Sequence, residues 1–268
     1  MSESLTAALL GLVQGLTEFL PVSSSGHLSL ISFWLPDSDL GGEQVARNLV
    51  LHLGTLIPVL YVYRESLLGI VKDAFKFELP LAERPGIRLM AWMIIGSIPT
   101  AAIGLGFKDR FEAMFGQPLV IGGAFLLTGV MLLATRWIPK GNTGEDGIRW
   151  WQALLIGLVQ GLAITPGISR SGSTIAVGLL LGLDREFAAR YSFLLSIPAI
   201  AGASLLELKD LQLTTDQMGP LLVGFLCALV SGYLALVFLL KLVKQGAFWK
   251  FSPYLCLVAG LSFWVAVG

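Results

Sequence analysis

The sequence has little charge and almost no cysteine. Only 13% of its 268 residues are charged and 55% are hydrophobic, with a mean hydropathy of +0.77. Since soluble domains carry about 25% charged residues, this chain lacks the polar surface that water requires. The two cysteines, Cys227 and Cys256, lie in apolar runs and have neither metal-ligand spacing nor a disulfide framework. The composition therefore excludes a soluble domain, a cysteine-based metal site and a disulfide-linked scaffold.

The sequence also lacks net charge and a basic N-terminal region. The 18 basic and 18 acidic residues cancel, so nothing indicates a polyanionic partner, and no nucleic acid is expected as a ligand. The first residues, Met1–Ser4, carry no lysine or arginine and no small-residue cleavage site follows them. The first apolar stretch is therefore expected to stay in the mature protein.

Long apolar runs are what the sequence has instead. A helix needs about 20 mostly apolar residues to cross ~30 Å of hydrocarbon. Six stretches meet this requirement, at about 45–63, 87–107, 118–138, 188–207, 218–240 and 251–267. We predict an all-α polytopic membrane protein with six transmembrane helices.

Two further apolar regions, about 4–35 and 151–183, are interrupted by Pro, Gly and Ser. The breaks fall at Leu20–His27 and at Thr165–Ser173, and each half is too short to span a bilayer. Irregular backbone at membrane depth survives only where protein or a watery cavity covers it. We interpret both regions as re-entrant helix–turn–helix loops; short ordinary spans or long kinked helices are the alternatives.

The two interrupted regions resemble each other. The string GLVQGL at Gly11–Leu16 recurs at Gly157–Leu162, and each copy is followed by a proline and a serine-rich turn. Three full spans separate the copies, so the second copy enters from the opposite face. The prediction is one transmembrane domain, 1–268, built of two inverted-topology repeats at about 1–140 and 147–268.

The basic residues give the orientation. Thirteen of the 18 fall on one face and four on the other, and Arg170 lies within the second loop. Because cytoplasmic loops are enriched in Lys and Arg, the first face is predicted to be cytoplasmic. Both termini and the mouth of the first loop would then face outward.

Polar residues at the breaks are the candidate site. An ionisable group in the bilayer centre costs at least ~2.5–3.5 kcal/mol and so must face protein or water. The first loop offers Gln14, Glu18, Ser24 and His27, which provide a nucleophile, a proton acceptor and a carboxylate. By contrast, His52 inside a span is interpreted as a packed, hydrogen-bonded histidine, with lining of the cavity as the alternative.

The second loop offers groups that bind phosphate. Half-helix N-termini favour anions, glycine lets the backbone approach closely, and Arg170 can hold two phosphate oxygens at once. The candidate phosphate-binding residues that accompany it are Gly167, Ser169, Ser171, Ser173 and Thr174. A carboxylate with an amide oxygen can also help to hold a divalent cation, so Gln14 and Glu18 are the candidate metal ligands.

These strings resemble the undecaprenyl-diphosphate phosphatases, also called the bacitracin-resistance family, over essentially the whole chain. The resemblance rests on Gln14–His27 and on Pro166–Ser171, and Gln14 leaves Glu18 as the only carboxylate of the first motif. It implies hydrolysis of undecaprenyl diphosphate to the monophosphate, assisted by Mg²⁺ or Ca²⁺, at an outward-facing site in the bacterial plasma membrane. It also implies that Glu18, Ser24, His27 and Arg170 are catalytic.

Three questions stay open at this point. Either Ser24 or His27 is the nucleophile. A transporter or flippase of a lipid phosphate or another anion would use the same broken helices, and a phosphatase for another lipid diphosphate would use the same site, since apolar grooves discriminate chain length poorly. Whether the chain forms a homodimer is also left open.

Overall fold

The computed structural model describes residues 2–33, 42–80, 83–209 and 215–267. Within these ranges the regular secondary structure is helical, with no β-strand, as predicted. The α-helices are α1 (Glu3–Phe19), α2 (Ser24–Ser32), α3 (Gly42–Val62), α4 (Arg64–Ala74), α5 (Pro85–Gly106), α6 (Lys108–Met114), α7 (Pro118–Ala134), α8 (Trp150–Leu162), α9 (Arg170–Leu180), α10 (Arg185–Glu207), α11 (Met218–Lys244) and α12 (Ser252–Val267). Three 3₁₀ helices accompany them: η3 (Thr135–Trp137), η4 (Thr215–Gln217) and η5 (Phe248–Phe251).

Five helical segments of the described chain are long and apolar enough to cross a bilayer. They contain α5, α7 with η3, α10, α11 with η4, and α12 with η5, and they match five of the six predicted stretches. The sixth stretch corresponds to α3, which passes the same test only together with α4, across a bend of 71°. Large apolar side chains such as Leu119, Leu257 and Ile98 are exposed on these helices. An apolar exterior of this kind is expected where lipid, not water, is the solvent.

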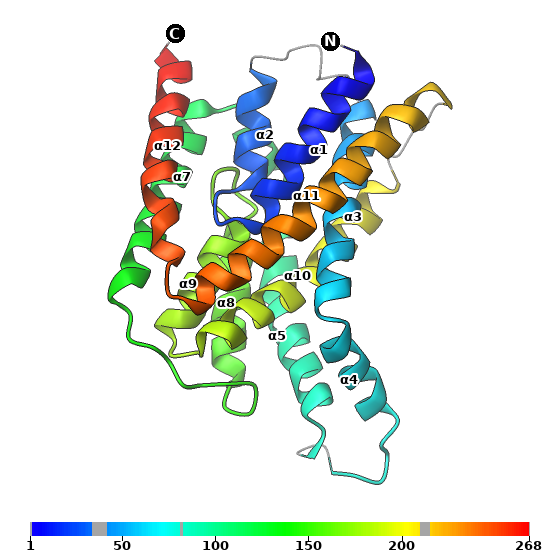
Figure 1. Cartoon of the computed structure of the whole chain (residues 1–268), viewed down its shortest axis with the longest axis vertical. Coiled ribbons are helices and arrows are strands. Elements are labelled where there is room, and N and C mark those ends of the chain that lie inside the picture. The colour runs from blue at the N-terminus through cyan, green and yellow to red at the C-terminus, as the bar shows by residue number, and fades with distance from the viewer. Residues whose placement is uncertain (1, 34–41, 81–82, 210–214, 268) are drawn as a thin grey trace.

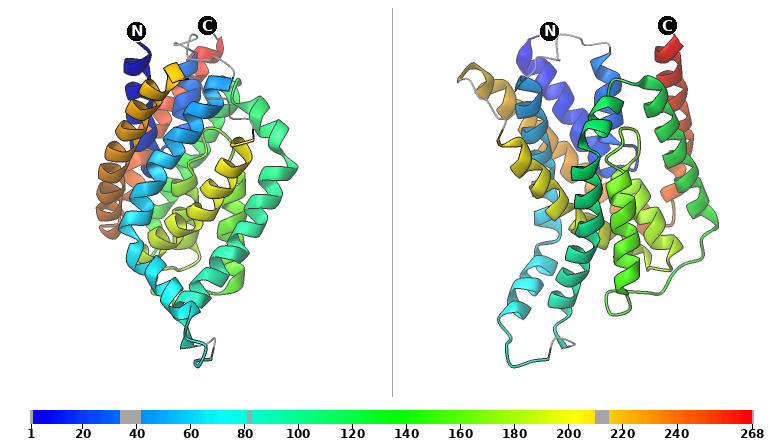
Figure 2. Two further views of the ribbon diagram at one scale, coloured as in Figure 1. Left: turned by 90° about the vertical axis from the view of Figure 1, so that its right-hand side faces the viewer. Right: turned by 180° about the vertical axis from the view of Figure 1, so that it is seen from behind.

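Two pairs of shorter helices fill the middle of the molecule. The pairs α1–α2 and α8–α9 approach from opposite ends, and their turns meet near the centre, as Figures 1 and 2 show. The N- and C-termini lie together at the end from which α1 and α2 enter (Figure 1). The turns of both pairs therefore lie inside the bundle, where the surrounding helices cover them.

The repeated string GLVQGL forms the helix–helix contacts of these pairs. A Cβ added to Gly15 would overlap the backbone of α11, and one added to Gly157 would overlap the carbonyl oxygen of Gly96 on α5. Small residues allow helix backbones to approach this closely, which is how helices associate where no hydrophobic effect drives them together. The glycines of the string thus pack α1 on α11 and α8 on α5.

The largest group of buried apolar side chains surrounds the two turns. It includes Phe19 at the end of α1, Phe125 on α7, and Tyr191 and Phe193 on α10. Each of these four rings is fully or almost fully buried. This packing holds the turns in fixed positions relative to each other.

Candidate active site

The turn of the first pair has strained backbone at Ser23. Helix α1 ends at Phe19, and α2 starts at Ser24 with Ser23 as its N-cap. Ser23 has φ +67°, a left-handed conformation that costs a residue other than glycine about 1–3 kcal/mol. Its hydroxyl oxygen accepts hydrogen bonds from the amide of Gly26 at 3.3 Å and from that of Gly167 at 3.1 Å. The strained residue therefore fastens the first turn to the second.

The turn of the second pair is built in a similar way. Gly167 has φ +96°, and Ser169 caps α9 by accepting the amide of Gly172 at 3.1 Å. Thr128 of α7 supports this turn, because its hydroxyl donates to the Gly167 carbonyl and accepts the Ser169 amide, both at 3.1 Å. Helix α9 then starts at Arg170, so the guanidinium leaves the turn where the two pairs meet.

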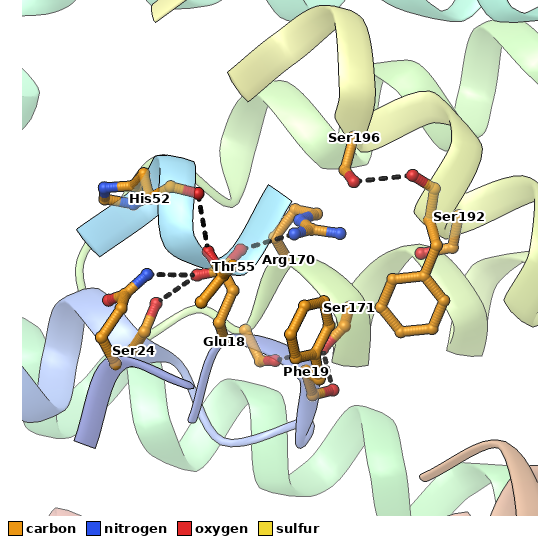
Figure 3. Close-up of polar contacts among 12 residues, drawn as sticks. Glu18, Phe19, Ser24, His52, Thr55, Arg170, Ser171, Ser192 and Ser196 are labelled. Carbon is orange, nitrogen blue, oxygen red and sulfur yellow. Dashed lines mark hydrogen bonds and ion pairs between the residues drawn. The ribbon is translucent and has the colours of Figure 1, made fainter. Parts of the chain in front are cut away.

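Glu18 is the centre of the polar cluster at this junction. Its Oε2 accepts hydrogen bonds from Ser24 Oγ at 2.7 Å and from Gln14 Nε2 at 3.2 Å. Its Oε1 accepts one from Arg170 Nη2 at 2.5 Å, and the two side chains form an ion pair (Figure 3). Only 9% of the Glu18 side chain and 16% of the Arg170 side chain are exposed. The structure thus brings together Gln14, Glu18, Ser24 and Arg170, which the sequence predicted as site residues.

Two polar atoms of this cluster have no partner among the described residues. Nη1 of Arg170 and Oε1 of Gln14 are buried and form no hydrogen bond. A buried, unpaired donor or acceptor costs about 1–3 kcal/mol, so such groups are usually paired. Because Arg170 is cationic and α2 and α9 both begin here with their positive dipole ends, the unused donor is suited to an anion.

His27 lies beside this cluster but has a separate set of contacts. Its Nδ1 is 2.8 Å from the Ser23 carbonyl and its Nε2 is 2.7 Å from the hydroxyl of Tyr254 on α12. Its ring meets Phe125 edge-on, with centroids 5.3 Å apart. Both ring nitrogens are therefore engaged away from Ser24, although the two residues are neighbours on one face of α2.

The predicted phosphate-binding residues of the second loop are buried and hydrogen-bonded to protein. Ser171 donates to the Phe19 carbonyl at 3.0 Å, Ser173 donates to the Arg170 carbonyl, and Thr174 shares a 2.6 Å hydrogen bond with Ser192. With the cap at Ser169, these contacts hold α9 in place and join it to α1 and α10. Direct contact of Gly167, Ser169, Ser171, Ser173 and Thr174 with phosphate stays a prediction.

The donor set does not fit a divalent cation held by protein ligands. Mg²⁺ and Ca²⁺ take about six to eight oxygen ligands, with carboxylates preferred. Glu18 is the only carboxylate of the cluster, and both of its oxygens already accept hydrogen bonds. Across the residues that the structure describes, no three His, Cys, Asp or Glu side chains are grouped closely enough to hold a metal ion. Gln14 and Glu18 as metal ligands therefore stay a prediction that this arrangement does not favour.

Several residues around the site were not singled out from the sequence. Thr128, Phe193 and Tyr254 lie in spans far along the chain, and residues of these types are common in any apolar helix. The Arg170 guanidinium lies 5.9 Å from the Phe193 ring centroid.

The Nδ1 of His52 is 2.8 Å from the Asn48 carbonyl, which confirms that this histidine is hydrogen-bonded. Figure 3 shows Thr55, whose hydroxyl donates to the His52 carbonyl, next to Glu18. Helix α3 therefore forms one wall of the site.

The fold and the site define a class of protein: a multi-pass helical membrane protein with a buried polar site between two inward-facing turns. Residues 7–261 match the family described as bacitracin resistance protein BacA. The chain belongs to this family.

Curated relatives named undecaprenyl-diphosphatase agree with this assignment. The protein of Desulfosudis oleivorans is 44% identical over 276 aligned residues, which cover 99% of each chain. That of Carboxydothermus hydrogenoformans is 43% identical over 258 residues, covering 94% of this chain and 93% of the relative. That of Methanosphaera stadtmanae is 40% identical over 276 residues, covering 97% of each.

Proposed function

We propose that this chain hydrolyses undecaprenyl diphosphate to undecaprenyl phosphate and inorganic phosphate, and so recycles the lipid carrier for cell-wall synthesis. The curated relatives are named for this activity, and they align with this chain over nearly their whole length. The observation that carries the proposal is the contact of one buried carboxylate, Glu18, with both a serine hydroxyl and an arginine guanidinium. This set provides a nucleophile, a base and an anion-binding group in one place.

Ser24 is the nucleophile in this proposal. Its hydroxyl already donates to Glu18 Oε2 at 2.7 Å, so the carboxylate can take the proton as the Ser24 oxygen attacks the terminal phosphorus. The bond from that phosphorus to the bridging oxygen breaks, and undecaprenyl phosphate leaves. Water then hydrolyses the phosphoserine, and Glu18 returns the proton to the Ser24 oxygen. His27 is less suited to the attack because both of its nitrogens are engaged elsewhere.

Arg170 binds the diphosphate and stabilises its charge during transfer. Phosphoryl transfer spreads negative charge over the equatorial oxygens, and a preorganised guanidinium stabilises that charge strongly in a site shielded from water. The free Nη1 gives the incoming phosphate a donor before the Glu18 contact at Nη2 has to open. The substrate phosphate therefore replaces Glu18 as the partner of the Arg170 guanidinium.

We also propose that α1–α2 and α8–α9 are re-entrant loops of an inverted repeat. If α8 in the second repeat corresponds to α1 in the first, and α11 corresponds to α5, then the α1–α11 contact corresponds to the α8–α5 contact. We call these two helix contacts the glycine seams. In one seam Thr100 donates to the Gly157 carbonyl at 2.8 Å, and in the other Ser231 donates to the Leu12 carbonyl at 3.5 Å. The same kind of contact recurs with the roles of the two halves exchanged.

The proposed location is the bacterial plasma membrane, with the basic face in the cytoplasm. The first turns of α5, α8 and α10 lie toward the end opposite the termini (Figure 1), and 13 of the 18 basic residues are predicted from the sequence to lie on this face. The mouth of α1–α2 then opens outward with both termini. The polyprenyl tail stays in the lipid while the diphosphate enters between the turns.

The experiment measures phosphate release from undecaprenyl diphosphate by the purified protein in detergent. Release is expected without any membrane compartment, and a carrier or flippase would release none. A panel of other lipid diphosphates tests the tail preference in the same assay. No release above a heat-inactivated sample would contradict the proposed function.

No reaction step in this proposal is assigned to a divalent cation. We expect Mg²⁺ or Ca²⁺ to assist hydrolysis, but the protein donors present do not form a site for either ion. Repeating the assay with a chelator, and then with each ion restored, tests this expectation. Unchanged release in chelator would show that the Arg170 charge suffices.

A further inference from the structure

We propose that Tyr254 is a positioning residue that fixes the tautomer and orientation of His27. Tyr254 belongs to α12, and its hydroxyl lies 2.7 Å from Nε2 of His27. The two ring planes are almost parallel, at 3°, with centroids 5.7 Å apart. The inference rests on the proposed function, because the effect of His27 is measured as phosphate release.

The partners of His27 determine where its proton lies. The Ser23 carbonyl can only accept, so Nδ1, at 2.8 Å, must carry the hydrogen. In a neutral imidazole the other nitrogen is then the acceptor, so the Tyr254 hydroxyl donates to Nε2. The pair of contacts makes Nε2 the basic nitrogen of His27.

Packing fixes the ring as well as the proton. The His27 ring meets Phe125 of α7 edge-on, and its plane is almost parallel to that of the Tyr254 ring of α12, with the two rings offset and joined through Nε2 and the hydroxyl. Helices α7 and α12 pack against each other, so the two rings beside His27 come from neighbouring helices. An imidazole held in this way keeps one orientation beside Ser24, one helical turn away.

The surroundings of Tyr254 support a specific role for its hydroxyl. Its side chain lies on a helix whose other large residues, such as Leu257 and Trp264, are exposed to the lipid side. A phenol hydroxyl in hydrocarbon needs a partner, and His27 is the partner that the structure gives it. A phenylalanine would fill the same space at lower cost, so packing alone does not explain the hydroxyl.

In the reaction His27 acts on the attacking water of the second step. The Tyr254 O–H first turns away from Nε2, whose freed lone pair takes a proton from the water that attacks the phosphoserine phosphorus. The bond from phosphorus to the Ser24 oxygen breaks, and Glu18 returns its proton to that oxygen. The Tyr254 hydroxyl turns from donor to acceptor for the new Nε2–H, and the proton then leaves to solvent. No further reactant is needed.

The first test compares Tyr254→Phe with Tyr233→Phe, a matched change at an exposed tyrosine of α11. Loss of one neutral hydrogen bond predicts a fall in kcat of about three- to tenfold for Y254F, with KM unchanged. Y233F should behave like the wild type. An unchanged kcat for Y254F would overturn the inference, whereas absence of phosphate release in the wild type and Y233F would overturn the proposed function instead.

The second test asks whether Tyr254 acts through His27. In a His27→Gln background, adding Y254F should lower kcat no further, because the positioned ring is already absent. An equal fall in both backgrounds would mean that Tyr254 acts independently of His27 and would overturn the inference.

The third test needs no activity. The chain has only two histidines, so ¹⁵N spectra of the imidazole nitrogens can be assigned with a His52→Gln variant. The wild type should show His27 protonated at Nδ1, and Y254F should shift the Nε2 resonance of His27 and leave His52 unchanged. An unshifted Nε2 would count against the hydrogen bond, even where Y254F reduced activity by weakening the fold.

Discussion

At the residue scale, Glu18 combines two roles that compete for the same oxygens. It accepts the proton of Ser24 and it neutralises Arg170, while Gln14 supplies a third donor. A buried charge without a partner is costly, so in the resting state the ion pair keeps both charges stable. In the proposed reaction, substrate phosphate replaces the carboxylate as the partner of Arg170, which frees Glu18 to accept the Ser24 proton. The resting contacts therefore prepare the exchange that starts the reaction.

Removing the Ser24 hydroxyl should stop hydrolysis and leave the fold intact. Ser24→Ala is expected to lower kcat by about a thousandfold or more, because no other hydroxyl donates to Glu18 in the described chain. Ser32→Ala is the matched control at the last residue of α2, where the hydroxyl only contacts the Ser29 carbonyl. Phosphate release under saturating substrate measures both, and an active Ser24→Ala would exclude this nucleophile.

Removing the Arg170 guanidinium should abolish turnover and also weaken the protein. Arg170→Ala leaves the Glu18 carboxylate buried and unpaired, which costs about 3–5 kcal/mol where a buried pair is broken. Adding Glu18→Gln should restore the thermal stability of the Arg170→Ala protein without restoring activity. Thermal unfolding in detergent together with phosphate release separates the two effects, and a fully active Arg170→Ala would contradict the proposed site.

At the element scale, the two glycine seams fix where the inward-facing pairs lie. Gly157→Ala should destabilise the protein by about 1–3 kcal/mol, because the new methyl group would meet the Gly96 backbone, which cannot move aside as a side chain can. Gly123→Ala in α7 is the control: nothing lies within reach of its added Cβ, so it should be neutral or gain about 0.5–1 kcal/mol. Thermal unfolding of both variants in one detergent checks this difference, and equal stabilities would show that the seam tolerates a methyl group.

The sequence predicts the elements well because their signals are local. Apolar length identified the spans, and Pro166 and the serine-rich turns identified the interruptions. It did not predict that α3 continues after a 71° bend into α4, since hydropathy gives length but not direction. Tyr254 was not predicted from the sequence either. This residue contacts His27 from 227 positions away, and nothing in the sequence near either residue indicates the other. Phosphate binding by the second-loop residues stays a prediction. The hydrogen bonds of Ser171 to Phe19 and of Thr174 to Ser192 were not predicted, because they depend on tertiary packing.

At the scale of the whole molecule, the orientation can be tested by labelling. In a variant with Cys227→Ala and Cys256→Ala, a cysteine at the exposed Asp109 should react with a membrane-impermeant maleimide in intact cells. A cysteine at the exposed Asn142 should react only after the membrane is permeabilised. The reverse pattern would invert the proposed orientation and place the mouth of α1–α2 in the cytoplasm.

The hydrogen bond from the Gly167 amide to Ser23 also has a consequence for how the protein is made. Residues 19 to 23 leave the ribosome long before residues 167 to 171, yet Ser23 and Phe19 find their partners there. A nascent chain that ends before Gly167 lacks the hydrogen bond that fastens Ser23 to the second turn. The contacts between the two turns can therefore form only after the second half of the chain has been made.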